Sequence, residues 1–264
     1  MIHDFDPVLI NFGILQIRWY SLAYILGILA GWMYGKVIIR KNILGNNQNN
    51  YLKNFDDLIG YIIIGIVVGG RLGYVIFYDP IFYLENISEI FKLWNGGMSF
   101  HGGFIGVIIA TYIFSNFKKL NYKIYFDTIC CVAPIGLFLG RIANFINGEL
   151  YGIPTEKPWG IIFPKIDNAM RHPSQIYEAL LEGFVLFIIL NFLATKKIIG
   201  NGLISSLFLI LYGTFRIISE QFREPDKHVG YIFEYLSMGS LLSTIMIIFG
   251  MLFLSKIIFN EKNR

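Results

Sequence analysis

The sequence predicts an all-α integral membrane protein with seven transmembrane helices, and two observations carry that prediction. Hydrophobic residues make up 55% of the 264 positions and charged residues only 15%, whereas a typical soluble domain has roughly 25% charged residues. The apolar residues also gather in blocks of about 20, which is the length of helix that crosses a hydrocarbon core roughly 30 Å thick. A net charge of +4 is mild, so nothing in the composition indicates a nucleic-acid partner.

Seven blocks have the length of a membrane span, and their edges are set by charged, Pro-rich or Gly-rich stretches. They cover residues 19–38, 57–78, 100–117, 125–146, 174–194, 203–220 and 233–258. The chain opens with acidic residues and shows no basic lead with a small-residue cleavage site, so we expect no removable signal peptide. Because no internal repeat is evident, residues 1–264 are predicted to form a single polytopic membrane domain.

The distribution of basic residues predicts the orientation of the spans. Twelve lysines and arginines flank the spans on one side and seven on the other, and basic residues favour cytoplasmic connections. This bias predicts an N-terminus outside and a C-terminus in the cytoplasm. Two outer connections, residues 79–99 and 147–173, are long and rich in Pro or Gly, so we expect them to form arms or a small cap.

In this orientation, most of the polar residues in and beside the spans lie at the depth of the outer leaflet. Three of them are arginines inside apolar blocks, and burying a charge there costs roughly 2.5 to 3.5 kcal/mol or more. Such residues usually face a cavity, pair with another group or bind a ligand. The set at this depth is Tyr20, Arg71, His101, Arg141, Asn144, Asn147, Glu149, Arg171, His172, Ser174, Tyr177, Glu178, Arg216, Glu220 and Arg223.

The three intramembrane arginines have different candidate partners. Arg216 and Glu220 are four residues apart and lie on one helical face, so a structural ion pair is one interpretation. Arg141 has no acid at helical spacing within its span, so an anion from outside the protein is its candidate partner. A guanidinium fork matches phosphate oxygens in a two-point geometry, and a phospholipid headgroup is the obvious anion at this depth. Arg71 is flanked by glycines and is more typical of a packing or pairing residue that shapes a lipid cleft.

Glycines and one histidine complete this set. Gly69, Gly73, Gly102 and Gly103 are typical of close helix packing, which is compatible with a lipid cleft. His101 precedes Gly102, and its unperturbed pKa near 6.5 suits proton transfer, although a hydrogen-bonded structural role is equally consistent with its position. The remaining histidines are scattered and no Cys or His-Glu-x-x-His ligand spacing occurs, so we expect neither a metal site nor a cofactor. The remaining histidines are His3, His172 and His228.

Several long ordered motifs resemble the bacterial prolipoprotein diacylglyceryl transferase family over nearly the whole chain. The run from Gly140 to Glu149, GRIANFINGE, resembles the signature of that family. The other matching runs are RWY at 18–20, GGRLGY at 69–74, WNGGMSFHGG at 94–103, RHPSQIYE at 171–178, YGTFR at 212–216 and EQFREPD at 220–226.

The resemblance implies an enzyme of the bacterial inner membrane that needs no cofactor and acts at the outer leaflet. It would move the diacylglyceryl group of phosphatidylglycerol to the lipobox cysteine of a prolipoprotein signal peptide, form a thioether and release glycerol phosphate. In the family, the residues that matter for activity or lipid binding match Tyr20, His101, Arg141, Asn144, Glu149, Arg216 and Glu220.

The chemistry of that reaction suggests a role for each of these residues. The leaving phosphate gains charge in the transition state, so we expect Arg141 and Arg216 to hold it, with Glu149 and Glu220 orienting the arginines or the glycerol. His101 is the candidate base for the substrate thiol, although the arginine field could itself lower the thiol pKa. The predicted substrate-binding set is Arg141, Tyr20, Asn144, Asn147, Gly102, Gly103, Arg71, His172 and Tyr177.

The alternative is a transporter or flippase that uses the same arginines to pass an anionic lipid or solute. Transporters often contain internal repeats and discontinuous helices near the midplane of the bilayer. Here no repeat is evident and the polar residues lie toward one face, which favours an enzyme. A purely structural subunit is a third interpretation, but it gives no reason for arginines whose burial in the membrane costs free energy.

Overall fold

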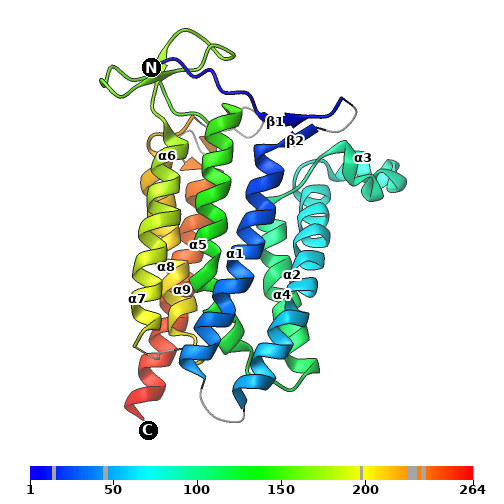
Figure 1. The fold of residues 1–264 in the computed structure, drawn as a ribbon, viewed down its shortest axis with the longest axis vertical. Helices are drawn as coiled ribbons and strands as arrows, with labels where there is room; N and C mark the ends of the chain where they lie inside the picture. The colour runs from blue at the N-terminus through cyan, green and yellow to red at the C-terminus, as the bar shows by residue number, and fades with distance from the viewer. Residues whose placement is uncertain (14–15, 44–46, 197–198, 225–230, 233–235, 264) are drawn as a thin grey trace. The chain divides into compact units, whose positions relative to one another are not determined.

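The computed structural model describes residues 1–13, 16–43, 47–196, 199–224, 231–232 and 236–263. Within these residues, seven helical stretches are long and apolar enough to cross a membrane (Figure 1), which confirms the predicted fold class. They are α1 (Trp19–Asn42), α2 (Asn47–Phe77), α4 (Phe100–Phe117), α5 (Tyr122–Asn147), a fifth stretch over Ser174–Ala194, α8 (Leu203–Glu220) and α9 (Met238–Lys262).

Most helix ends lie within a few residues of their predicted positions. The largest difference is at α2, which begins at Asn47 and not at residue 57, because the polar stretch before the apolar block is also helical. The expected start of the seventh span, Phe233, lies outside the described residues, and α9 begins at Met238 after the N-cap Ser237.

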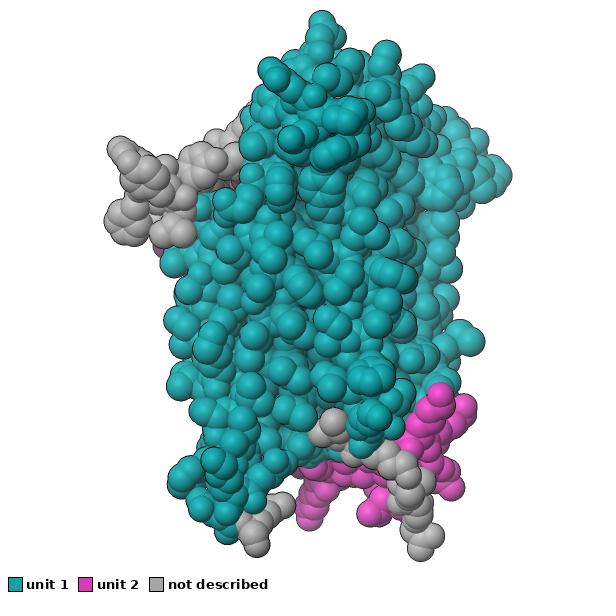
Figure 2. Space-filling model, turned by 90° about the vertical axis from the view of Figure 1, so that its left-hand side faces the viewer, with its two compact units in different colours: residues 1–38, 127–264 teal, residues 39–126 magenta. Residues whose placement is uncertain are grey.

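Contacts divide the chain into two compact units (Figure 2). Unit 1 contains residues 1–38 and 127–264, and unit 2 contains residues 39–126. In unit 1, the N-terminal segment and the connection after α5 lie at one end of the helices and the C-terminus lies at the other (Figure 1). The interpretation of residues 1–264 as a single domain stays a prediction.

Large apolar side chains cover the outward faces of the long helices. Met33, Phe192 and Phe253 in unit 1 and Ile64 in unit 2 are each more than half exposed. A water-soluble monomer rarely exposes so much continuous apolar surface, whereas lipid tails accept it without cost. The helices therefore have the surface of a membrane-embedded protein.

Glycines hold α2 and α4 of unit 2 in close contact. A Cβ added at Gly102 would lie 2.2 Å from the carbonyl oxygen of Gly69, and one at Gly106 would lie 1.9 Å from that of Gly65. Only glycine permits this approach, which confirms the interpretation of Gly69 and Gly102 as helix packing positions. Ser99 caps α4 by accepting a hydrogen bond of 3.2 Å from the Gly102 amide.

The first predicted arm, between α2 and α4, folds into short helical pieces. They are α3 (Pro80–Glu85), η1 (Ile87–Phe91) and η2 (Leu93–Asn95). The arm is tied to α2 by the hydrogen bond from the Ser99 amide to the Gly70 carbonyl, 2.8 Å long, and by the side chain of Arg71.

The second predicted arm, between α5 and the fifth span, forms a small structure with the N-terminal segment. Its strands β3 (Ile161–Ile162) and β4 (Met170–Arg171) pair antiparallel, and Ile2 pairs with Ile162 in parallel. His3 is buried, with its Nε2 atom 2.6 Å from the Phe145 carbonyl oxygen. The remaining strands form two further antiparallel pairs, β1 (Val8–Asn11) with β2 (Gln16–Arg18) and β5 (Tyr231–Ile232) with β6 (Leu236–Ser237).

Arg171 joins this second arm to the end of α8. Its guanidinium contacts Asp167 at 2.6 Å, pairs with Glu224 and donates a 3.0 Å hydrogen bond to the Gly152 carbonyl. It also lies over the ring of Tyr151, 5.0 Å from the centroid. Within unit 1, this set of contacts fixes the arm to the end of α8.

Candidate functional site

Two of the three intramembrane arginines meet in one buried ionic cluster inside unit 1. Arg141 on α5 contacts Glu178 at 2.9 Å through Nη1 and Glu182 at 3.0 Å through Nη2. Arg216 on α8 pairs with the other oxygen of Glu178 and lies 3.6 Å from Glu182. A third contact of Arg216, 2.5 Å to Glu220, confirms the predicted pair on one helical face.

The fifth span supplies the two central carboxylates. It consists of α6 (Ser174–Glu178), the π-helical stretch η3 (Ala179–Val185) and α7 (Leu186–Ala194). Glu178 ends α6 and Glu182 lies within η3, and both side chains are fully buried. Single π-helical turns inside α-helices are frequent at functional sites, and this one begins directly after Glu178 and contains Glu182.

A glycine sets the distance between the fifth span and α5. A Cβ added at Gly183 would lie 2.6 Å from the Cβ of Phe138, so only glycine allows this approach. Phe138 lies one turn before Arg141 on α5, and Gly183 follows Glu182. The close packing therefore holds Arg141 against Glu182.

Charges of opposite sign are balanced in the described part of this cluster, which contains three arginines and three glutamates. Arg223 is the third arginine, with its Nη1 atom 3.6 Å from Glu178. Pairing compensates the desolvation that makes buried charges expensive, and each carboxylate here has at least one guanidinium within 4 Å. The arrangement can remain ionised inside the protein.

This cluster gives Arg141 internal partners that its own helix does not supply. No acid lies at helical spacing on its own span, which suggested an external anion as its partner. The structure supplies Glu178 and Glu182 from a different span, so the guanidinium already has two internal counter-ions. Helical spacing detects only partners on the same helix, and this pairing is made between helices.

A turn after α5 brings Glu149 back to the end of that helix. Gly148 and Leu150 have φ of +69° and +57°, the left-handed backbone that reverses the chain. The Glu149 carboxylate accepts hydrogen bonds from the Asn144 amide group at 2.7 Å and from that of Asn147 at 3.3 Å. The structure therefore brings these three predicted site residues together.

Two tyrosines near the start of α1 approach this part of unit 1. The hydroxyl of Tyr20 lies 3.2 Å from that of Tyr24, and their rings meet edge to face. Tyr24 in turn lies within electrostatic reach of Arg141 and Glu149. Tyr20, a predicted substrate-binding residue, is thus connected to the arginine cluster through its neighbour one helical turn away.

His172 and Tyr177 meet at the beginning of the fifth span. The His172 Nδ1 atom lies 3.1 Å from the Tyr177 hydroxyl, which accepts a 2.7 Å hydrogen bond from the indole N–H of Trp159. Partial burial, and next the charge of Lys157, lower the pKa of His172 below its ordinary value. Because the Tyr177 hydroxyl accepts from Trp159, it can donate its own proton to Nδ1 of a neutral His172 ring.

The other predicted site residues belong to unit 2. His101 is the second residue of α4 and is half-buried, and its ring meets that of Phe100 edge to face. Gly102 is a packing residue against Gly69. Gly103 faces a looser contact, because a Cβ there would lie 3.6 Å from the nearest atom.

Arg71 has a different role from the other two arginines. Its guanidinium donates to the carbonyl oxygens of Ile90 at 2.8 Å, Gly97 at 3.0 Å and three further residues of the first arm. It also lies 5.2 Å from the centroid of the Tyr83 ring. Only 4% of Arg71 is exposed, so its charge is used to hold the arm, consistent with its interpretation as a pairing residue.

Sequence reasoning missed three members of the cluster: Glu178 as a partner of both arginines, Glu182 and Tyr212. Glu182 carried a usable signal, because an acid in the middle of an apolar span has the same insertion cost that singled out the arginines. Tyr212 is buried on α8 and interacts electrostatically with Arg141 and Arg216. No spacing rule marks it, since tyrosine is common in spans.

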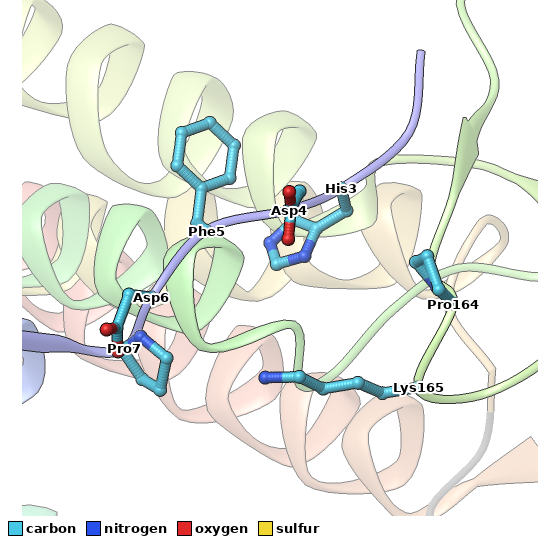
Figure 3. Close-up of a pocket in the computed structure, with 7 residues that line it drawn as sticks. All are labelled: His3, Asp4, Phe5, Asp6, Pro7, Pro164 and Lys165. Atoms are coloured by element: carbon cyan, nitrogen blue, oxygen red, sulfur yellow. The ribbon is translucent and has the colours of Figure 1, made fainter.

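A separate pocket lies beside the second arm, with a volume of about 320 Å³. Figure 3 shows residues 3–7 of the N-terminal segment along one side and Pro164 and Lys165 of the arm on the other. None of the predicted site residues lines it. In the part of the chain that the structure describes, no group of three or more His, Cys, Asp or Glu residues is placed to hold a metal ion.

Comparisons with known proteins give one consistent result. The family model described as prolipoprotein diacylglyceryl transferase matches residues 7–256. A curated phosphatidylglycerol–prolipoprotein diacylglyceryl transferase of Rickettsia bellii (strain OSU 85-389) is 51% identical over 255 residues, which is 96% of this chain and 95% of the relative. The protein of the same name from Rhodopseudomonas palustris is 48% identical over 252 residues, 94% of this chain and 88% of the relative.

Proposed function

The chain belongs to the prolipoprotein diacylglyceryl transferase family, and from that membership we propose that it transfers the diacylglyceryl group of phosphatidylglycerol to a prolipoprotein. The acceptor is the thiol of the lipobox cysteine in the signal peptide. Its sulfur forms a bond to the glycerol carbon that bears the phosphate, and the carbon–oxygen bond to the phosphate breaks. The products are a thioether and glycerol phosphate, and the thiol proton passes to a base.

The observation that carries this proposal is the extent of the similarity. About half of the residues are identical over at least 94% of the chain in relatives of that name, and the matched region contains the whole arginine cluster. A transporter that passes anionic lipid is the alternative from a different class. No feature of the described structure favours it over the transferase.

Arg141 and Arg216 are proposed to bind the phosphate and to stabilise the charge that it gains as it leaves. A guanidinium carries five N–H donors, more than the two contacts that Arg141 makes with Glu178 and Glu182 require. Phosphate oxygens can therefore be bound on the remaining side of the fork. Glu220 orients Arg216 through their 2.5 Å contact.

The neighbouring polar groups are proposed to bind the glycerol and the incoming peptide. Glu149 is held by Asn144 and Asn147 in the geometry of a hydrogen-bond acceptor for a glycerol hydroxyl. Tyr20 and the group of His172 and Tyr177 would bind the lipid and the peptide near the membrane surface. In unit 2, Gly102, Gly103 and Arg71 would shape the lipid site through helix packing and the first arm.

His101 is the proposed base for the substrate thiol, since its ordinary pKa suits proton transfer near neutral pH. Replacing it by Gln should lower the rate of single-turnover transfer with little loss of phosphatidylglycerol binding. Unchanged single-turnover transfer in His101→Gln would assign thiol activation to the positive field of the arginines instead.

The proposed location is the bacterial inner membrane, with the N-terminus outside, the C-terminus in the cytoplasm and the cluster toward the outer leaflet. The support is the excess of basic residues at the membrane face on which the C-terminus lies. Labelling of single cysteines placed near residue 5 and near residue 260 with an impermeant thiol reagent in intact cells tests it. Labelling at the C-terminal position only would reverse the orientation.

One experiment separates the transferase from the transporter. Purified protein in vesicles is given a lipobox peptide and phosphatidylglycerol that carries its label in the acyl chains. The peptide is then analysed for a thioether-linked diacylglyceryl group. A transferase yields the modified peptide and releases glycerol phosphate. Movement of label between leaflets without any modified peptide would contradict the proposal.

The arginine assignment is tested by Arg141→Lys. Lysine keeps the charge but lacks the two-point fork, so we expect at least a tenfold loss of transfer, or about 1.4 kcal/mol of transition-state stabilisation, in protein that remains folded in the membrane. The matched control is Arg40→Lys, at an exposed position outside the cluster. Near-normal turnover of Arg141→Lys would rule out the phosphate-binding role.

A further inference from the structure

Glu182 stands apart from the other two acids of the cluster in the contacts that it makes. Its Oε2 atom pairs with Arg141 at 3.0 Å, and its Oε1 atom lies 3.6 Å from Arg216. In the described structure, each of the three acids has one buried oxygen without a hydrogen-bond partner. That oxygen still has a guanidinium nitrogen at 2.9 Å in Glu178 and at 2.5 Å in Glu220, whereas the nearest one to Glu182 Oε1 is at 3.6 Å. Leaving a buried acceptor unsatisfied costs stability. The Oε1 atom of Glu182 is therefore the least closely paired of these three oxygens.

The other two acids have clearer structural roles. Glu178 contacts Arg141, Arg216 and Arg223 and so joins three helical segments. Glu220 pairs with Arg216 and packs against the first turn of α9, since a Cβ at Gly239 would lie 2.9 Å from its carboxylate oxygens. Glu178 bridges the two arginines assigned to the phosphate and also pairs with Arg223, whereas the ion pairs of Glu182 among the described residues are with those two arginines alone.

The proposed reaction places a demand on these arginines that tight anion binding alone does not meet. The substrate is a phosphodiester with one negative charge, whereas the released phosphomonoester carries roughly −1.5 to −2 at pH 7. A site with excess positive charge would hold the product more tightly than the substrate. A carboxylate that is paired with a guanidinium competes with phosphate for it, because both anions accept hydrogen bonds from the same N–H groups.

We infer that Glu182 is a built-in counter-ion that limits the hold of Arg141 and Arg216 on phosphate, so that the glycerol phosphate product can leave. This inference rests on the proposed function and adds a specificity-determining residue to it. Glu182 is fully buried and acts only through the arginines. With its charge present, the three arginines and three glutamates balance, and the product meets no excess positive charge.

The test replaces Glu182 by Gln and measures the binding of glycerol phosphate to the purified protein by calorimetry, together with its inhibition of transfer. Removing the carboxylate should tighten product binding about tenfold, equivalent to roughly 1.4 kcal/mol. It should also lower KM for phosphatidylglycerol and lower kcat, because release becomes slower. A residue with a purely structural role would weaken product binding and raise KM when it is replaced.

Two further variants keep the test decisive. Glu182→Met also removes the charge but leaves no unpaired amide in the protein interior, and replacing a buried ionic side chain by an apolar one is often tolerated. It should tighten product binding in the same way. Glu182→Asp keeps the charge, and we expect product inhibition close to that of the unmodified protein.

Asp127 provides a matched control, since it is a fully buried carboxylate of unit 1 outside the cluster. It accepts hydrogen bonds from the amides of Gly200, Gly202 and Ser205 at 2.8 to 3.1 Å. Asp127→Asn should lower the thermal midpoint and leave the affinity for glycerol phosphate unchanged.

The possible outcomes distinguish this inference from the proposed function. Equal or weaker glycerol phosphate binding in folded Glu182→Gln and Glu182→Met overturns the counter-ion role, whatever the transfer activity. Failure of the unmodified protein to form any thioether product overturns the proposed function instead. Tighter product binding in both neutral variants, reversed in Glu182→Asp, supports the inference.

Discussion

Arg71 offers the sharpest test of how an intramembrane charge is used in unit 2, and the perturbation is Arg71→Lys. The guanidinium donates to five carbonyl oxygens of the first arm, through Nε at 2.8 Å and through Nη1 and Nη2 at 2.5 to 3.3 Å. Lysine has three donors on a single nitrogen. It can therefore satisfy at most three of these carbonyls, and its geometry does not match the fork.

The expected loss follows from the number of hydrogen bonds removed. At least two bonds are lost, and each is worth about 1 kcal/mol or more in net terms. The local stability of the arm should thus fall by about 2 kcal/mol, which corresponds to a roughly 30-fold larger open population. Because the charge is retained, the loss reports the fork geometry and not charge removal.

Hydrogen exchange measured by mass spectrometry in detergent or nanodiscs reads this effect directly. The amides of Lys92, Gly96 and Ser99, which donate to backbone carbonyls of the arm and of α2, should exchange roughly 30-fold faster, while those of α8 should not change. Arg40→Lys is the control. Unchanged protection of the arm in Arg71→Lys would refute the anchoring role.

Three further predictions follow from single contacts. Gly106→Ala should destabilise the protein by about 3 kcal/mol because the added Cβ would lie 1.9 Å from a carbonyl oxygen of α2, whereas Gly103→Ala should be nearly neutral; equal thermal midpoints would contradict this. Gly140→Ala should leave the stability unchanged, since a Cβ there meets no atom within 4 Å, so a lowered thermal midpoint would count against it. His172 has a pKa lowered first by burial and then by Lys157, so it binds protons less readily when folded. The contribution of His172 to the free energy of unfolding is therefore fully present above its unfolded pKa of about 6.5 and is lost as the pH falls toward the folded pKa. In His172→Gln, the thermal midpoint should fall less steeply between pH 7 and pH 5 than in the unmodified protein. An unchanged dependence of the midpoint on pH would exclude His172 as the cause.

The sequence was sufficient for the spans because the cost of burying an unpaired backbone or a charge in lipid acts on each segment locally. Every long helix matches an apolar block, and Ser99 and Gly148 mark ends that their residue types favour. The pair of Arg216 and Glu220 was also predictable, since both residues lie on one helix. The hydrogen bonds that join Glu149 to Asn144 and Asn147 depend on a turn whose glycine is visible in the sequence.

The contacts between segments distant in sequence were decided only by the tertiary structure. Arg141 meets Glu182 across 41 positions, and Arg71 binds carbonyls that carry no side-chain signal. The pattern of hydrophobic residues states which side of a helix is polar but not which helix that side will face. The sequence alone thus determined that the chain is a membrane protein with costly buried arginines. Only the packing of the helices decided that Arg141 and Arg216 are balanced by internal acids while Arg71 holds an arm, because the energy of a buried charge depends on the groups that surround it in space.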